Sequence, residues 1–132
     1  MTESNVEVVR SLFERYEREG IEGVLETMDE DIVLEIPPEL SAEPDDYRGH
    51  DGARRYFAGF AGMIDDVRYE AIELIPAGEA VIAHIRLSGR GASSGLDADL
   101  EAFVVHELAN GRIVRMRPYA ELQEAQAAVG GR

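Results

Sequence analysis

The stretch FVVHELANGRIVRMRPY, residues 103–119, decides the fold. Runs rich in apolar and β-branched side chains flank Asn110-Gly111, which is the strongest short-range hairpin signal in the chain. A two-residue type I′ turn requires positive φ at both central residues, and Asn and Gly tolerate that backbone best. The stretch therefore predicts antiparallel strands at 96–108 and 112–119, joined by a tight turn.

Three further strand-like runs precede this hairpin. Residues 67–75 and 79–87 are rich in apolar side chains and are separated by a Pro-Ala-Gly turn. An earlier run, 31–36, ends at Pro37-Pro38, because proline has no N–H to donate to a neighbouring strand. The last four predicted strands are consecutive, which is typical of an antiparallel sheet.

Helical periodicity marks the N-terminal part of the chain. Ser4 and Glu7 form a capping box, and apolar residues at helical spacing predict a helix over 4–19. After Gly20 the pattern resumes as a second short helix, whose apolar face is formed by Ile21, Val24, Leu25 and Met28.

Two more helices are predicted further along the chain. Asp51 is placed to cap a third helix after an acidic loop at 39–49, and residues 121–129 predict a short C-terminal helix. The order is helix, helix, strand, helix and then four strands. Helices on one face of a mainly antiparallel sheet give the class α+β.

Length and charge limit the function classes. A chain of 132 residues predicts a single domain over 1–132, and without cysteine it has no disulfide or thiolate chemistry. The net charge of −14 disfavours nucleic acid and membrane surfaces as partners, because both are anionic. The N-terminus resembles no signal peptide, so we expect a cytoplasmic protein.

Two segments carry a resemblance to a known family. YRGHDGARRYF, residues 47–57, resembles the loop and third helix of the SnoaL-like branch of the nuclear-transport-factor-2-like superfamily, and residues 110–119 resemble its final hairpin. The resemblance implies a cone: three N-terminal helices packed on a strongly curved sheet around one small apolar pocket. It also implies a homodimer through the sheet face.

Ketosteroid isomerases belong to the same superfamily, and their chemistry needs a carboxylate base and two acids that hydrogen-bond the dienolate oxygen. By the resemblance, the base position falls on Ile36 and one oxyanion-hole acid on Phe103. The tyrosine position falls near Leu12 or Phe13, with Tyr16 one turn away. We therefore do not expect ketosteroid isomerase activity.

The resemblance also orients two strands, since it implies that Phe103 points into the cone. Side chains alternate along a strand, so Glu101 would share the inward face, together with Ile82, His84 and Arg86 of the neighbouring strand. The outward face would then be apolar and would suit a dimer contact, with His106 beside it. That outward set comprises Val81, Ala83, Ile85 and Leu87.

This orientation supplies the candidate site residues. Glu101, positioned by Arg86 and backed by His84, would be a catalytic carboxylate that activates water or removes a proton from a carbon acid. The alternative is a structural ion pair near the mouth of the cone. The ligand-binding residues would be Tyr16, Ile36, Tyr56, Phe60, Ile82, Phe103 and Met116.

The sequence thus predicts a small-molecule-binding SnoaL-like protein that takes a compact, apolar ligand with one polar handle. It would act either as a cofactor-independent acid/base enzyme, of the lyase, isomerase or hydrolase kind, or as a non-catalytic ligand-binding or dimerisation domain. No organic cofactor is implied. A metal site is not expected, because the three histidines are far apart in sequence.

Overall fold

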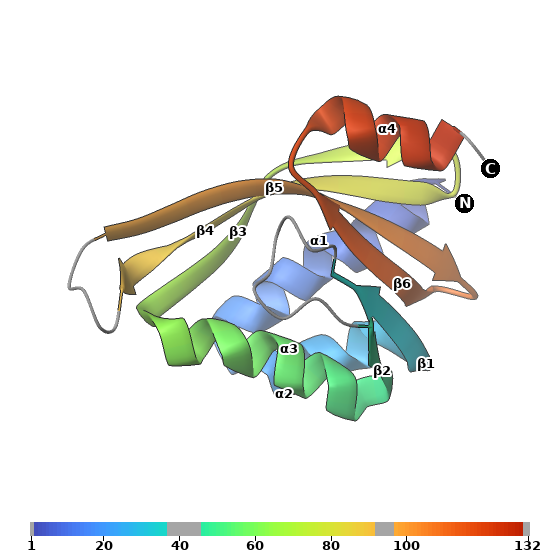
Figure 1. Ribbon diagram of the computed structural model, residues 1–132. Helices are drawn as coiled ribbons and strands as arrows, with labels where there is room; N and C mark the ends of the chain where they lie inside the picture. Colours follow the sequence, from blue (N-terminus) through green and yellow to red (C-terminus); the bar gives the residue numbers. More distant parts are fainter. Residues whose placement is uncertain (1, 37–45, 92–96, 131–132) are drawn as a thin grey trace.

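The computed structural model describes residues 2–36, 46–91 and 97–130, with side chains described for these residues apart from 2–3, 60–65, 97–98 and 130 (Figure 1). The predicted α+β class is confirmed. The elements in chain order are α1 (Thr2–Glu19), α2 (Ile21–Val24), the 3-10 turn η1 (Leu25–Thr27), β1 (Met28–Glu35), β2 (Asp46–Arg48), α3 (Gly49–Met63), β3 (Ile64–Ala77), β4 (Ala80–Gly91), β5 (Asp97–Ala109), β6 (Arg112–Tyr119) and α4 (Leu122–Gly130).

The strands form one sheet in the order β2-β1-β6-β5-β4-β3. Neighbouring strands are antiparallel except β1 and β6, which run parallel. The predicted tight turn joins β5 to β6, with φ of 53° at Asn110 and 77° at Gly111. The two strands of this hairpin have different outer neighbours: β5 pairs with β4, the preceding strand, and β6 pairs with β1, far away in sequence.

The helices lie on both faces of the curled sheet. Figure 1 shows α1, α2 and α3 together on one face and α4 on the opposite face. We call these the inner face and the outer face. None of the described helices is long and apolar enough to cross a membrane.

The inner face carries the main hydrophobic core. Apolar residues of α1, including Val9, Leu12 and Phe13, belong to this core, where α1 packs against β3, β4 and β6. A separate, smaller apolar cluster lies on the outer face under α4, where Ala125 is fully buried against Ile82 and Val105. Each face of the central strands is therefore covered in part, and the outer face remains open beyond α4.

The predicted orientation of β4 and β5 is wrong. Val81, Ala83, Ile85 and Leu87, expected to face outward, are buried in the main core against the N-terminal helices. His84 and Arg86 alternate with them and pair with Phe103 and Glu101, so all four lie on the outer face. The error follows from period-2 alternation, since a one-residue displacement in alignment turns every side chain of a strand to the other face.

Most element bounds differ from the prediction by a few residues, and three differences affect how elements are assigned. Met28, expected in the second helix, is the first residue of β1, and the short edge strand β2 was not predicted. The third helix begins at Gly49, so Asp51 lies in its first turn and is not its cap. Both β2 and the start of α3 depend on pairing of Tyr47 with Leu34, a contact between segments distant in sequence.

Candidate functional site

The inner core contains a cluster of aromatic rings from three elements. Phe13 of α1 stacks on Tyr69 of β3 with centroids 5.1 Å apart, and Phe57 of α3 lies 5.5 Å from the rings of both Tyr16 and Tyr69. Tyr56 lies edge-on to Phe57 at 5.2 Å. Burial raises the pKa of Tyr16, Tyr56 and Tyr69, so their hydroxyls stay protonated at neutral pH.

His106 of β5 is the polar group at this cluster. Its side chain is fully buried, its ring lies edge-on to Phe13 at 6.4 Å, and Met116 is its partner on β6. Nδ1 lies 3.1 Å from the carbonyl oxygen of Val104. Among the described residues, Nε2 has no hydrogen-bond partner.

Burial lowers the pKa of His106 to about 4, and the backbone carbonyls of Val81 and Val104 oppose that shift only in part. The imidazole is therefore neutral at pH 7. Since a carbonyl can only accept, Nδ1 carries the proton and Nε2 presents a lone pair. The arrangement provides one buried hydrogen-bond acceptor beside a cluster of aromatic rings. The prediction that His106 lies on the opposite face, beside a dimer contact, is wrong as to the face.

The three residues expected to be catalytic lie together on the outer face, away from the aromatic cluster. Nε2 of His84 is 2.7 Å from Oε1 of Glu101, and His84 stacks on Phe103 at 4.4 Å. Arg86 donates to both carboxylate oxygens of Asp99, at 2.9 and 2.7 Å, although Glu101 is directly opposite it. The expectation that this group points into the cone is wrong. The Arg86–Asp99 ion pair and the His84–Glu101 contact lie on the sheet surface, where Asp99 and Glu101 are exposed.

The residues expected to bind ligand are divided between the two faces. Tyr16, Tyr56 and Met116 belong to the inner core, whereas Ile82 and Phe103 belong to the cluster under α4. The reason is the same one-residue displacement in alignment that exchanged the two faces of β4 and β5 in the prediction. Ile36 is buried just beyond the end of β1, and Phe60 is a prediction that falls outside the described side chains.

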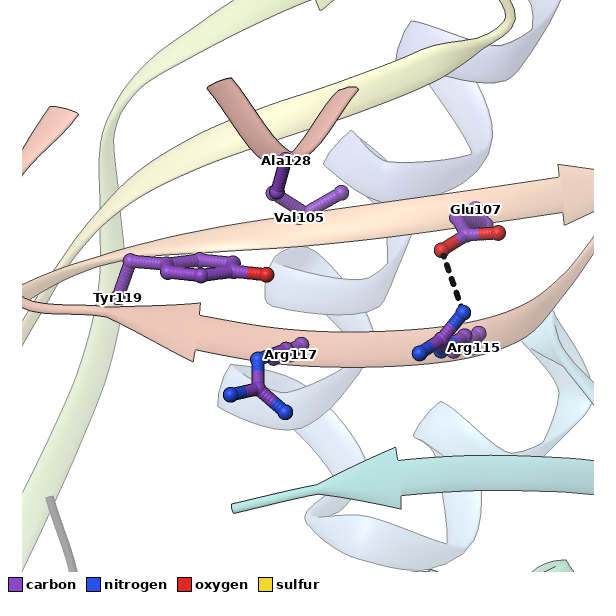
Figure 2. Close-up of a pocket in the computed structure, with 6 residues that line it drawn as sticks. All are labelled: Val105, Glu107, Arg115, Arg117, Tyr119 and Ala128. Carbon is purple, nitrogen blue, oxygen red and sulfur yellow. Dashed lines mark ion pairs between the residues drawn. The ribbon is translucent and has the colours of Figure 1, made fainter. Parts of the chain in front are cut away.

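A pocket of about 400 Å³ opens on the outer face between β5, β6 and α4 (Figure 2). Its lining residues are Val105, Glu107, Arg115, Arg117, Tyr119 and Ala128. This pocket was not predicted from the sequence, although the spacing Arg115-x-Arg117-x-Tyr119 places three polar side chains on one face of a strand. The spacing does not show that α4 folds back over the sheet and forms the wall of the pocket opposite to β6.

A second pocket of about 400 Å³ lies between η1, α3 and the start of β6. Arg54 is held there by Glu22 and Asp51 at 2.8 and 2.7 Å, and Nε2 of His50 lies 3.1 Å from the carbonyl oxygen of Met28. The Arg54–Glu22 contact ties α3 to α2, and the His50 contact ties α3 to the first residue of β1. Within the part of the chain that the structure describes, no three His, Asp or Glu side chains are grouped to hold a metal ion.

Comparison with known proteins identifies the family. The SnoaL-like domain family matches residues 9–116, and the chain belongs to that family. No curated protein matches the chain. The fold and the family thus agree with the resemblance in residues 47–57 and 110–119.

Solved structures share the fold at low sequence identity. A nuclear-transport-factor-2-like protein of unknown function from Burkholderia pseudomallei is 24% identical, with a TM-score of 0.77 and coverage of 92% of this chain and 93% of that one. TerC, co-crystallised with polyporic acid, is 19% identical, with a TM-score of 0.77 and coverage of 96% and 98%. A protein with a ketosteroid-isomerase-like fold from Catenulispora acidiphila, in complex with trimethylamine, is 14% identical, with a TM-score of 0.73 and coverage of 94% and 92%.

Proposed function

We propose that the protein binds a compact, largely apolar small molecule on the inner side of the sheet, through a hydrogen bond that the ligand donates to Nε2 of His106. The observation that carries the proposal is the buried lone pair of Nε2, which has no partner among the described residues. Buried polar atoms nearly always have a partner, because leaving one unpaired costs about 1–3 kcal/mol. A ligand hydroxyl or N–H removes that cost.

The neighbouring side chains specify the rest of the ligand. Phe13, Tyr16, Phe57 and Tyr69 favour an aromatic or alicyclic body, because rings pack edge-on or offset against one another. Nε2 accepts and does not donate, so the polar handle is an alcohol, a phenol or an N–H group. A ketone, an epoxide or a lactone without a hydroxyl has no proton to offer.

The charge state of His106 favours binding over proton transfer. A general base works best when its pKa lies near the working pH, whereas burial lowers the pKa of His106 to about 4. At pH 7 the imidazole is a neutral acceptor with little capacity to remove a proton. Ligand binding without acid/base chemistry is therefore the function that we adopt.

Two of the similar structures add support. TerC was crystallised with polyporic acid, and the Catenulispora acidiphila protein was crystallised with trimethylamine. Each ligand belongs to the protein that it was crystallised with. The two structures support the proposal because proteins of this fold have been crystallised with small molecules of different chemistry.

The test compares phenol with anisole, which have the same ring but differ in the O–H. Titration followed by NMR should show wild-type protein binding phenol about ten times more tightly than anisole, the equivalent of one hydrogen bond. His106→Phe should bind the two equally, because the phenylalanine ring has no acceptor. His84→Phe, which changes a histidine of the outer face, should retain the preference for phenol.

The proposal fails if wild-type protein does not discriminate between phenol and anisole. It also fails if His106→Phe retains the preference, because another group would then accept the hydrogen bond. Backbone amide shifts locate the binding site in either case, since α1 and β5 residues near the aromatic cluster should move and α4 should not.

A further inference from the structure

The outer pocket shown in Figure 2 has the composition of a binding site, and it lies on the face of the sheet opposite to His106. Val105 and Ala128 form an apolar wall. The ring of Tyr119 reaches in from one end, and the charged side chains of β6 lie along the opposite edge. Its volume of about 400 Å³ is within the range of small-molecule sites.

Arg115 is fully engaged by protein carboxylates. Its Nε and Nη2 lie 3.0 and 2.5 Å from Oε1 of Glu35, and its Nη1 lies 3.5 Å from Oε2 of Glu107. Because two carboxylates surround one guanidinium, Arg115 serves to hold β1, β5 and β6 together. It leaves little positive charge for a ligand.

Arg117 is in a different situation. The nearest carboxylate oxygen, Oε1 of Glu35, is 3.7 Å from its Nη1, which is too long for a hydrogen bond. Its guanidinium lies over the Tyr119 ring, 5.4 Å from the centroid. Within the described residues, neither the Arg117 guanidinium nor the Tyr119 hydroxyl has a hydrogen-bond acceptor, so both are free to donate to a ligand.

We propose that this pocket binds a small organic monoanion, whose carboxylate is held by Arg117 and the Tyr119 hydroxyl while its apolar body lies against Val105 and Ala128. A planar carboxylate matches the donor geometry of a guanidinium. Glu35 and Glu107 stand at the same edge and repel excess negative charge, so a single charge is favoured over a dianion such as phosphate. The site is separate from the proposed ligand position at His106.

Benzoate is the probe for this site, and benzamide is its neutral counterpart. In an NMR titration, benzoate should shift the backbone amides of Val105, Tyr119 and Ala128, and benzamide should bind about ten times more weakly. Inorganic phosphate should shift these amides less than benzoate at the same concentration. Equal binding of benzamide, or stronger binding of phosphate, would overturn the proposal.

Single substitutions test which residues bind benzoate. Arg117→Gln should weaken benzoate binding about tenfold or more, and Ala128→Leu should weaken it by filling the pocket. Arg86→Gln, which removes an arginine from the same face outside the pocket, should leave the affinity unchanged. An unaltered affinity in Arg117→Gln contradicts the proposal.

The two proposed sites are distinguished by their histidine and arginine variants. His106→Phe should retain benzoate affinity and lose the preference for phenol over anisole. Arg117→Gln should lose benzoate affinity and retain the preference for phenol. Loss of benzoate binding in His106→Phe would mean that benzoate occupies the inner core and that the outer pocket is not its site.

Discussion

The burial of His106 makes the stability of the fold depend on pH. An imidazole with a pKa of 6.5 in the unfolded chain and about 4 in the folded protein is protonated first in the unfolded state. Its contribution to stability is therefore complete above pH 6.5 and is lost as the pH falls toward 4. A difference of this size corresponds to roughly 3 kcal/mol.

Replacing His106 by Phe should remove this dependence. Urea unfolding at pH 7 and at pH 4.5 should show wild-type protein losing more stability than His106→Phe, by roughly 2–3 kcal/mol. The many carboxylates titrate in both proteins, so the comparison between them isolates the histidine. Parallel losses of stability in the two proteins would show that His106 is not buried in the neutral form.

Single residues were the hardest feature to predict from the sequence. Tyr16, Tyr56 and Met116 were expected to bind ligand inside the cone; they belong to the inner core, and their contact with a ligand stays a prediction. His84, Arg86 and Glu101 were assigned to the wrong face, because one reference position, Phe103, fixed the orientation of two strands at once. The surroundings of His106, whose Nε2 has no partner among the described residues, depend on contacts with α1 and β6 that no local pattern contains.

Among the elements, the β5–β6 turn depends on the backbone of Gly111. Its φ of 77° lies in the left-handed region, and an added Cβ would meet no atom within 4 Å, so the cost of a side chain there is purely conformational. Gly59 of α3 also has free space around it, but its φ is not positive. Gly111 and Gly59 therefore have equal space for a Cβ and differ in φ, so the same substitution at both isolates the effect of the backbone conformation.

Gly111→Ala should lower the free energy of unfolding by about 1–2 kcal/mol, because a left-handed backbone is unfavourable for a residue with Cβ. Gly59→Ala should raise it by about 0.5–1 kcal/mol, because alanine loses less entropy than glycine in a helix. Chemical denaturation measures both. Stabilisation by Gly111→Ala would mean that the turn does not have positive φ at this position.

Elements with strong local signals were predicted well. The bounds of β6 agree with the prediction, and the central strands and α1 differ from it only at their ends. The edge strand β2 was missed because its three residues have no strand pattern and owe their conformation to pairing with β1. Met28 was misassigned because an apolar residue at helical spacing equally suits the first position of a buried strand.

At the level of the complete fold, the assignment of the sheet faces has the largest consequence. Ile85 and Arg86 are adjacent on β4 but point to opposite faces. Ile85→Glu should lower stability by more than about 3 kcal/mol, because it buries a charge among the α1 side chains. Arg86→Gln should have a small effect, since its partner Asp99 remains exposed to water. If denaturation curves showed a larger loss of stability for Arg86→Gln than for Ile85→Glu, the orientation expected from the sequence would be correct.

Homodimerisation through the sheet stays a prediction. The apolar residues that first suggested it belong to the inner core, so a dimer of this kind would use the outer face, where Arg86 and Glu101 lie. Under this hypothesis, sedimentation velocity should show a dimer for wild-type protein and a monomer for Arg86→Glu, because the new carboxylate adds to Asp99 and Glu101. A dimer that persists in Arg86→Glu would place the interface elsewhere.

The state of the His106 ring tests the proposed ligand site most directly. A long-range proton–nitrogen NMR spectrum at pH 7 reports the protonation of each ring nitrogen, first without ligand and then with phenol or anisole. We predict a protonated Nδ1, an unprotonated Nε2, and an Nε2 resonance that moves with phenol but not with anisole. A protonated Nε2, or an Nε2 resonance that does not respond to phenol, would contradict the account.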